Sequence, residues 1–319
     1  MRATAALILA SLATPVAGEL RLALPVDCTL GEACFIQQYM DLDPSQGVID
    51  YRCNALSYDG HKGTDFAVAT NEAARAGVDV IASAPGRVLG TRDGMPDVWS
   101  GDIDADAIAG RDCGNGMVID HGDGWHTQYC HLAEGSVSVA QGDLVETGDV
   151  LGQIGMSGRT QFPHVHLSVR KDGKPVDPFA PETAQCGEEN QPSLWSNPID
   201  YAIGGIVDGG FASAVPDYDA VKDGTAAERI MRVSPAIIAY SLMFGGRTGD
   251  VLRMTLTGPG DLLVTDDHVL PRNRARFFRA IGKKRRDAPW PGGDYLNITE
   301  LIRDGAVIST RRDTFSIPR

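Results

Sequence analysis

Short β-rich segments separated by Gly, Asp and Pro fill most of the first two thirds of this 319-residue chain. Such punctuation predicts brief strands joined by tight turns, and no amphipathic helix of normal length competes with it. We therefore expect an antiparallel β-sheet domain over residues 54–180, with the two Gly-Asp turns of residues 139–155 forming a compact β-roll. The predicted strands are Thr64–Ala69, Val78–Ala82, Gly86–Leu89, Met117–Asp120, Thr127–Leu132, Leu144–Val145, Val150–Ile154 and Val165–Arg170.

The remaining segments divide the chain further. Residues 19–53 carry three cysteines and are expected to form a stapled N-terminal extension. Residues 181–200 are rich in Pro, Asn and acid, which is typical of a linker. Beyond them, apolar and polar residues alternate around Met254, and this period of two predicts a small C-terminal β-sandwich-like domain over residues 201–319. The chain is thus expected to be mainly β throughout.

The charge of the chain argues against nucleic acid as a partner. Its 42 acidic and 29 basic residues leave a net charge of −13, which repels phosphate backbones and anionic lipid. The excess of acid lies entirely before residue 190, where 27 acidic residues face 12 basic ones. Two parts of different character share the chain.

The N-terminus has the pattern of a cleaved signal peptide. Arg2 precedes an apolar run over residues 5–13, and small residues follow up to Gly18, so we expect a signal peptide over residues 1–18 and a mature chain beginning at Glu19. The run is too short to span a bilayer, as is the apolar stretch of residues 236–244. The sequence therefore predicts an exported protein of the periplasm or cell envelope without a stable membrane span.

Export favours disulfides for the six cysteines, since an even set in an oxidising compartment is usually paired. A zinc cluster of thiolates is the less favoured alternative because no C-x-x-C pair exists. Six cysteines allow 15 pairings, but a hairpin around residues 121–124 would bring Cys113 and Cys130 nearly opposite one another. The cysteines are Cys28, Cys34, Cys53, Cys113, Cys130 and Cys186.

The candidate chemistry lies in the histidines, six of whose seven members fall between residues 61 and 166. His61 and Asp65 form an H-x-x-x-D pattern, and His164 and His166 form H-x-H on a predicted strand. Residues two apart on a strand project from the same face, so both histidines would point at one spot. Imidazole and carboxylate suit zinc, and a catalytic zinc typically keeps three protein ligands. Each motif alone is more often structural; their co-occurrence with His131 favours a site.

Five ordered blocks around these residues resemble the lysostaphin/LytM-type zinc endopeptidases, which are peptidoglycan hydrolases. The resemblance covers about residues 56–178 and ends in the family-like GKPVDP of residues 173–178. It implies a LytM-like β-sheet peptidase domain. The blocks are GHKGTDFA (60–67), GNGMVIDHGDG (114–124), TQYCHL (127–132), GDLV (142–145) and GMSGRTQFPHVHL (155–167).

The resemblance also implies a role for each matched position. His61, Asp65 and His166 would be the Zn²⁺ ligands, and His131 and His164 would be the catalytic histidines. One imidazole would accept a proton from water and the other would stabilise the developing oxyanion, although the sequence does not assign these two roles between them. The other histidines, at positions 121, 126 and 268, are interpreted as non-catalytic.

Two features depart from the simplest members of the family. The first is an acidic insertion over residues 93–112, in which Asp102, Asp104 and Asp106 suggest calcium but lack the Gly and Glu of an EF-hand loop. We interpret it as a solvated acidic loop lining the groove. The second is the C-terminal domain, whose basic cluster is either a solvated hairpin or a surface that docks on the acidic first domain or an anionic polymer. The cluster comprises Arg272, Arg274, Arg276, Arg279, Lys283, Lys284, Arg285 and Arg286.

Two hypotheses for function follow. The favoured one is a zinc-dependent endopeptidase that hydrolyses peptide cross-links of bacterial peptidoglycan, with stem peptides as its partners. The alternative is a non-catalytic LytM-like module that binds and activates another cell-wall hydrolase. The C-terminal domain is a candidate for contact with another envelope protein. All five metal and catalytic positions are present, which favours the enzyme.

Overall fold

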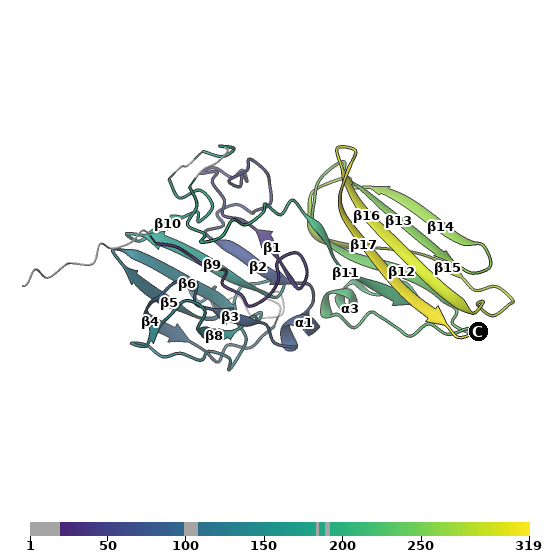
Figure 1. Cartoon of the computed structure of the whole chain (residues 1–319), viewed down its shortest axis with the longest axis horizontal. Coiled ribbons are helices and arrows are strands. Elements are labelled where there is room, and N and C mark those ends of the chain that lie inside the picture. Colours follow the sequence, from purple (N-terminus) through teal and green to yellow (C-terminus); the bar gives the residue numbers. More distant parts are fainter. Residues whose placement is uncertain (1–19, 99–107, 183–184, 189–191) are drawn as a thin grey trace, which may run out of the picture.

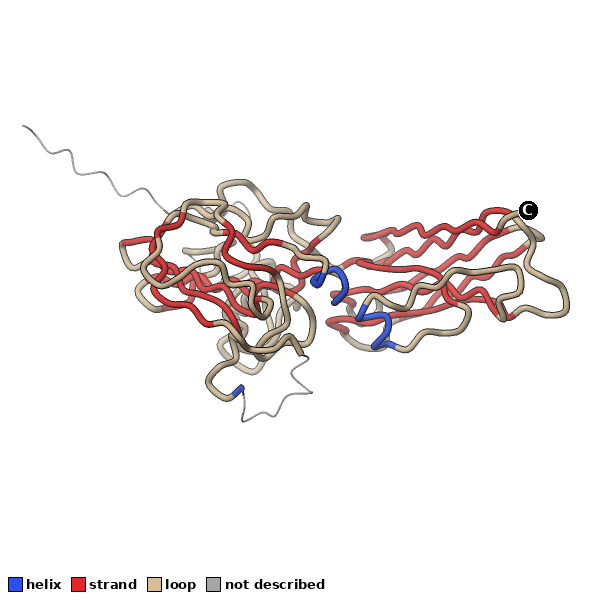
Figure 2. The backbone as a smooth tube through the Cα atoms, turned by 90° about the horizontal axis from the view of Figure 1, so that it is seen from below, coloured by secondary structure: helices blue, strands red, loops and turns tan. Residues whose placement is uncertain are grey.

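Two β-rich parts lie side by side in a computed structural model of the chain (Figures 1 and 2). The structure describes residues 20–98, 108–182, 185–188 and 192–319. The expected signal peptide lies outside the described residues, and so do Asp102, Asp104 and Asp106. Nearly all regular structure in the described part is antiparallel strand, which confirms the mainly β fold class.

The first part is built on an eight-stranded antiparallel sheet with the order β1-β2-β9-β6-β5-β4-β7, in which β10 pairs with β9. A second, two-stranded sheet pairs β3 with β8. Every predicted strand of this region is present, with ends that differ by a few residues. The strands are β1 (Cys34–Gln38), β2 (Thr64–Val68), β3 (Asp79–Ile81), β4 (Gly86–Arg92), β5 (Asn115–Gly122), β6 (Trp125–Leu132), β7 (Leu144–Val145), β8 (Val150–Gln153), β9 (His164–Lys171) and β10 (Lys174–Val176).

Strand β9 is central because it pairs with both β2 and β6. Its register places His166 opposite Asp65 on β2 and opposite Cys130 on β6. Phe66, Tyr129 and other apolar side chains of these strands are fully buried in one core. The apolar side chains fix the register, since a slip by one residue would turn every side chain to the opposite face. Core packing therefore also sets which polar side chains meet.

The N-terminal segment is part of this sheet rather than an appendage. Strand β1 pairs along β2, while Leu22, Val26 and Tyr39 are buried in the same core. The boundary expected at residue 54 therefore does not separate two structural units. The sequence missed this because β1 holds only five residues and its partner lies beyond an irregular loop.

A linker was expected over residues 181–200, but the described residues of this segment pack against the first part of the molecule. Leu194 and Trp195 are buried in the core of the first part, and Trp195 forms a bridge with Leu22. The disulfide Cys53–Cys186 closes a loop of 133 residues around the sheet. The part of this segment that the structure describes therefore belongs to the first part of the molecule.

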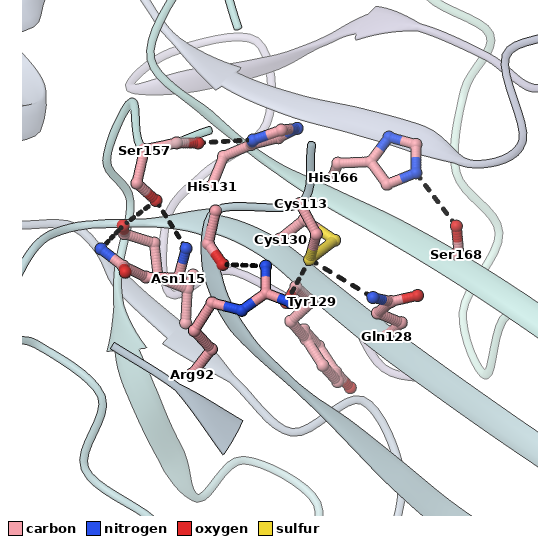
Figure 3. Close-up of a disulfide and its surroundings, with 12 residues drawn as sticks. Arg92, Cys113, Asn115, Gln128, Tyr129, Cys130, His131, Ser157, His166 and Ser168 are labelled. Atoms are coloured by element: carbon pink, nitrogen blue, oxygen red, sulfur yellow. Dashed lines mark hydrogen bonds between the residues drawn. A yellow bond between two sulfur atoms is a disulfide. The ribbon is translucent and has the colours of Figure 1, made fainter. Parts of the chain in front are cut away.

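All six cysteines are paired, as expected, and none is left for a thiolate zinc cluster. The hairpin argument is confirmed, since Cys113 and Cys130 are bonded between adjacent strands (Figure 3). The third disulfide joins Cys28 to Cys34 within the N-terminal segment. Closing the Cys113–Cys130 loop contributes on the order of 3 kcal/mol through the unfolded state.

The second part consists of two antiparallel sheets that enclose one apolar core, which is a sandwich arrangement. The three-stranded sheet has the order β11-β12-β15, and the four-stranded sheet has the order β14-β13-β16-β17. Met254 and its alternating apolar neighbours on β13 face this core, as their period of two predicted. The strands are β11 (Gly205–Ala212), β12 (Ala236–Gly246), β13 (Val251–Gly258), β14 (Leu262–Val269), β15 (Arg274–Lys284), β16 (Gly293–Arg303) and β17 (Ala306–Ile317).

The stretch of residues 236–244 is largely apolar because both faces of β12 are buried, each in a different apolar cluster. Ile237 and Met243 face the sandwich core, whereas Tyr240 and Leu242 pack with Val221 of α3 in a smaller cluster. A strand covered on both faces reads as a continuous apolar run. None of the helices among the described residues is long and apolar enough to cross a membrane.

Two short helices meet at the junction of the two parts. They are α1 (Asn71–Arg75) and α3 (Tyr218–Asp223), and they face each other in Figure 1. Arg75 forms an ion pair of 3.1 Å with Asp223 across the junction. From the basic cluster, Arg276 also crosses, donating a hydrogen bond to the carbonyl of Ala69. The cluster is therefore not purely a solvated hairpin, because one of its members docks on the first part.

Candidate metal and catalytic site

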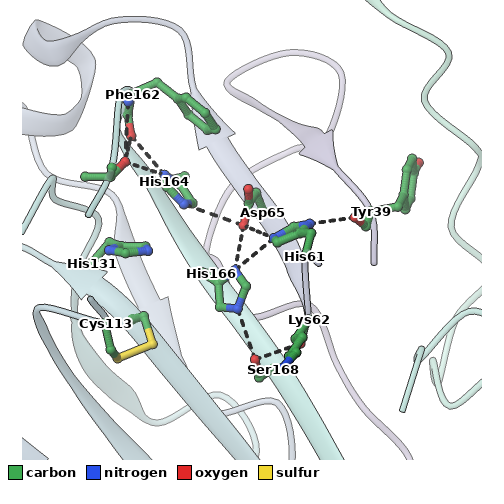
Figure 4. A network of polar contacts seen from close by, with 12 residues as sticks. Tyr39, His61, Lys62, Asp65, Cys113, His131, Phe162, His164, His166 and Ser168 are labelled. Carbon is green, nitrogen blue, oxygen red and sulfur yellow. Dashed lines mark hydrogen bonds and ion pairs between the residues drawn. A yellow bond between two sulfur atoms is a disulfide. The ribbon is translucent and has the colours of Figure 1, made fainter. Parts of the chain in front are cut away.

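Three side chains of the first sheet converge on one point with their ligand atoms within 4.8 Å of one another (Figure 4). They are His61, on the loop that leads into β2, Asp65 on β2 and His166 on β9. The Oδ1 atom of Asp65 lies 3.1 Å from Nε2 of His61 and 2.8 Å from Nδ1 of His166. The two imidazole nitrogens are 3.0 Å apart. Pairing of β2 with β9 brings together residues separated by a hundred positions.

The remaining nitrogen of each imidazole is held by a neighbour. Nδ1 of His61 lies 2.6 Å from the carbonyl oxygen of Tyr39 and must donate to it, because a carbonyl only accepts. Nε2 of His166 lies 3.0 Å from Oγ of Ser168. Since that hydroxyl donates to the carbonyl of Lys62, it accepts from His166. Both histidines are thereby fixed in tautomers that turn a lone pair toward Asp65.

This donor set fits a metal ion. Two nitrogen lone pairs and a carboxylate oxygen face one another with no proton donor between them, so the cluster needs a proton or a cation at its centre. Two imidazoles and one carboxylate form a three-ligand set of the kind found at catalytic zinc sites. Tyr39 and Ser168 supply the outer hydrogen bonds that typically orient metal-binding histidines.

His131 sits at the end of β6 beside this cluster. Its Nδ1 lies 2.8 Å from the carbonyl oxygen of Ser157 and donates to it, which leaves Nε2 free. Its φ of 66° lies in the left-handed region, which costs a non-glycine residue energy. The backbone N–H of His131 donates to the carbonyl of Cys113 at 2.8 Å, so the adjacent disulfide helps to hold this conformation (Figure 3).

His164 lies between His131 and the cluster. Its Nδ1 donates to the carbonyl oxygen of Phe162 at 2.9 Å, so that Nε2 is directed at Asp65, 3.5 Å from Oδ1. The ring centroids of His131 and His164 are 4.7 Å apart. Two further imidazoles with free Nε2 atoms thus border the three converging side chains, as Figure 4 shows.

Burial dominates the electrostatics of the site. It lowers the pKa of His131 well below the ordinary value, with the charges of His164 and His166 adding to the effect. It also lowers the pKa of His164, against the opposing attraction of Asp65. Burial alone would raise the pKa of Asp65, but His61 and His164 outweigh it and hold that pKa well below its usual range. Two neutral imidazoles therefore stand beside an ionised carboxylate.

The sequence interpretation missed the residues that hold these side chains. One of them is Tyr39, whose carbonyl orients His61, and Asp41 supports the same loop by accepting the N–H of Gly60 at 2.9 Å. Both belong to the N-terminal segment that was expected to be an extension. Ser157 lies within the GMSG block, but a backbone carbonyl leaves no signature in a sequence.

The remaining sequence predictions for this region have mixed outcomes. His126 is on the same face of the sheet as His166, because it pairs with Arg170 just as Cys130 pairs with His166, but it lies four residues from Cys130 along β6 and 3.8 Å from Asp120. His121 bonds to the carbonyl of Pro85. Within the acidic insertion, Asp97 accepts the backbone N–H groups of Met156 and Glu134. The described end of the insertion is thus tied to the loop that bears Ser157 rather than solvated throughout.

Residues 59–178 match the family model described as Peptidase family M23. These residues form a peptidase family M23 domain. The match begins and ends within three residues of the range expected from the sequence blocks. It includes all five converging or bordering side chains, but neither the N-terminal segment nor the sandwich.

The M23 domain has curated relatives among cell-wall enzymes. It is 32% identical over 120 residues to the DD-carboxypeptidase/endopeptidase Mpg of Neisseria meningitidis serogroup B, covering 38% of this chain and 22% of that relative. It is 32% identical over 117 residues to the peptidoglycan DD-endopeptidase ShyA of Vibrio cholerae serotype O1, covering 37% of this chain and 22% of that relative. The chain thus spans about a fifth of the length of these relatives.

A solved structure shares the same region. The catalytic domain of a mutant of the prophage-encoded M23 protein EnpA from Enterococcus faecalis has 22% sequence identity and a TM-score of 0.33. The likeness covers 49% of this chain and 94% of that one. The sandwich falls outside the family match.

Proposed function

We propose that this protein is a zinc-dependent endopeptidase that hydrolyses peptide cross-links of bacterial peptidoglycan. The observation that carries the proposal is the convergence of His61, Asp65 and His166 with their lone pairs facing one another. An M23 domain and relatives named as peptidoglycan endopeptidases support the substrate class.

The proposed ligands are the three converging side chains. His61 and His166 contribute neutral nitrogen donors whose orientation is set by Tyr39 and Ser168, and Asp65 contributes one oxygen. When bound there, zinc supplies Lewis acidity, which polarises a carbonyl and lowers the pKa of water toward neutrality. Low exposure of the ligands, 1% for both His61 and Asp65, keeps competing water away from them.

His131 and His164 are the proposed catalytic residues. Each holds its Nδ1 proton on a backbone carbonyl and presents an unprotonated Nε2. One of the two imidazoles accepts the proton of the attacking water and passes it to the leaving amine. The other takes up a proton from solvent at Nε2 as negative charge develops on the carbonyl oxygen, donates a hydrogen bond to that oxyanion, and returns the proton to solvent once the peptide bond is broken.

Export is part of the same proposal. Three disulfides account for all six cysteines, and disulfides persist in oxidising compartments such as the periplasm. We propose a location in the periplasm or cell envelope, where stem peptides are the partners and nucleic acid is not.

Metal analysis combined with muropeptide release tests the proposal. Purified protein is expected to hold one zinc per chain and to convert cross-linked muropeptides of peptidoglycan into uncross-linked ones. A chelator is expected to remove both the metal and this activity. His126→Ala is the matched control, since His126 is on β6 but lies four residues from Cys130, the partner of His166, and contacts Asp120 instead of the three converging side chains. Protein that holds no zinc and releases nothing, yet stimulates a second hydrolase, would favour the non-catalytic module instead.

A further inference from the structure

A pocket of about 670 Å³ lies at the junction of the two parts, next to the candidate catalytic histidines. The first part contributes residues of α1 and of the loops that end in Met156 and Pro163, and the second part contributes α3 and Arg276 of β15. Pro163 immediately precedes His164, and Met156 immediately precedes Ser157, whose carbonyl holds His131. A group bound in this pocket would lie beside the proposed reaction centre.

Most charges that line the pocket are already neutralised. Arg75 pairs with Asp223 at 3.1 Å, and Lys222 pairs with Asp219 at 2.7 Å. The carboxylate of Asp97, the remaining acid in the lining, accepts two backbone N–H groups. Four of these charges are therefore paired with one another, and Asp97 keeps its charge but is satisfied by hydrogen bonds from the backbone.

Arg276 is the exception. No carboxylate of the described residues lies within 4 Å of its guanidinium, which donates instead to the carbonyl of Ala69. Its Nε is buried and has no hydrogen-bond partner. Burial lowers the pKa of Arg276 to about 10, so the group stays charged at neutral pH. Asp208 opposes this effect of burial through its charge but makes no direct ion pair with Arg276. A buried cation without a direct ion pair is costly, and an anion in the pocket would offset that cost.

The position of Arg276 links it to the reaction centre. Its guanidinium carbon lies 5.6 Å from the centroid of the Phe162 ring. The Phe162 ring in turn packs on the His164 ring, with 4.5 Å between the ring centroids. The backbone carbonyl of Phe162 accepts a hydrogen bond from Nδ1 of the same histidine. The unpaired charge is thus one aromatic ring away from a proposed catalytic histidine.

We propose that this pocket is a subsite for a carboxylate of the peptide substrate, and that Arg276 of the C-terminal sandwich recognises it. The proposal rests on the proposed function, because it assigns the sandwich a role in choosing the peptide that is cut. Arginine suits this task because its planar fork binds a carboxylate through two parallel hydrogen bonds. Peptides that end in a free carboxylate beside the cleaved bond are the favoured substrates.

Two matched peptides provide the main test. One is a cross-linked stem peptide with free carboxylates, and the other is the same peptide with those carboxylates amidated. Wild-type protein is expected to favour the free acid by ~10- to 100-fold in kcat/KM, the range of a charge-assisted hydrogen bond. Arg276→Gln should remove the preference by slowing only the free acid, and Arg276→Lys should restore part of it.

Gln37→Ala is the control for docking, because it removes the hydrogen bond of 3.0 Å that Gln37 donates to the carbonyl of Ala275 across the junction, while Gln37 lies outside the pocket and the charges of the pocket are unchanged. It should retain the preference. If Arg276→Gln slows both peptides equally, Arg276 only holds the two parts together and the subsite is refuted. Equal turnover of both peptides by the wild-type protein would refute it as well.

Calorimetric titration separates failure of the subsite from failure of the proposed function. The probes are an uncleavable stem peptide with free carboxylates and its amide, each titrated into wild-type protein and into Arg276→Gln. If wild-type protein hydrolyses neither substrate but binds the acid at least ~10-fold more tightly than the amide through Arg276, the subsite stands and the endopeptidase does not. Equal binding of the acid and the amide overturns the subsite.

Discussion

In the C-terminal sandwich the buried carboxylate of Asp250 meets the guanidinium of Arg303, whereas in the first sheet the buried carboxylate of Asp65 meets three imidazoles. The Asp250–Arg303 pair is bidentate, with contacts of 2.7 and 2.9 Å. Charge is thus neutralised within the sandwich. In the first sheet, the lone pairs of His61 and His166 face Asp65 and leave the cluster incomplete without a cation. The difference indicates that the Asp250–Arg303 pair serves stability, whereas the cluster around Asp65 is arranged to bind a cation.

The largest expected effect comes from removing one of the converging side chains. His166→Ala takes away a nitrogen ligand, so the purified variant should lose zinc and its hydrolysis of peptidoglycan should fall to background. Elemental analysis and muropeptide release measure the two properties. The His126→Ala control should retain both.

Zinc retained at one per chain in His166→Ala would contradict the ligand assignment. A reversal is also informative: if His164→Ala loses the metal and His166→Ala keeps it, the roles of the two histidines are exchanged.

Breaking the closed ion pair of the sandwich should affect stability instead. Asp250→Ala leaves the guanidinium of Arg303 without its carboxylate partner in a site where the Arg303 side chain is only 8% exposed. The variant should therefore lower the free energy of unfolding by ~3–5 kcal/mol. Asp267→Ala is the matched control, since its pair with Arg253 is exposed to solvent and should lower the free energy of unfolding far less than Asp250→Ala does. Denaturant titration measures both.

Zinc content of folded Asp250→Ala should equal that of the wild type. A loss of metal in this variant while it remains folded would show that the Asp250–Arg303 pair also affects the metal site, so that this pair could not be assigned to stability alone.

The two bordering histidines should separate catalysis from metal binding. His131→Ala and His164→Ala each leave the three proposed ligands in place, so zinc should stay at one per chain. Hydrolysis should fall by at least ~10²-fold, because a proton acceptor or an oxyanion donor is lost. Unchanged turnover in both variants, measured beside their metal content, would refute the proposed mechanism.

The smallest expected effect is a pH dependence of stability that arises in the first part. Burial raises the pKa of Asp177 to about 7, with a further contribution from Asp50, and its Oδ2 has no hydrogen-bond partner. Because the native state holds this proton more tightly than the unfolded chain, the contribution of Asp177 is most favourable below about pH 4. It is lost as the pH rises toward 7, by up to ~1.4 kcal/mol per pH unit.

Asp177→Asn should flatten the dependence of unfolding free energy on pH between 4 and 7. Chelator-treated wild-type and variant protein are compared by denaturant titration, so that bound metal makes no contribution. Parallel curves for the two proteins over this range would show that Asp177 is ionised in the native state.

Eight of the ten strands described in the first part, the disulfide Cys113–Cys130 and the side chains that meet at the site could be predicted from the amino-acid sequence. Alternation with a period of two and turn residues such as Gly and Asp act locally, so they can be interpreted without knowing what a segment packs against. The H-x-H pattern predicted that His164 and His166 share a face because the pleat of a strand requires it. The ordered blocks then indicated the family and the candidate ligands.

How those side chains are held, and what lies beside them, depends on contacts between distant segments that the sequence does not reveal. The carbonyl that orients His61 comes from Tyr39 in a segment expected to be separate, and backbone carbonyls have no sequence signature. Arg276 contacts Ala69 across 207 residues, and no local pattern distinguishes it from its neighbours in the basic cluster. Burial and pairing are properties of packed surfaces, so a charge left unpaired becomes visible only when both sides of the junction are in place.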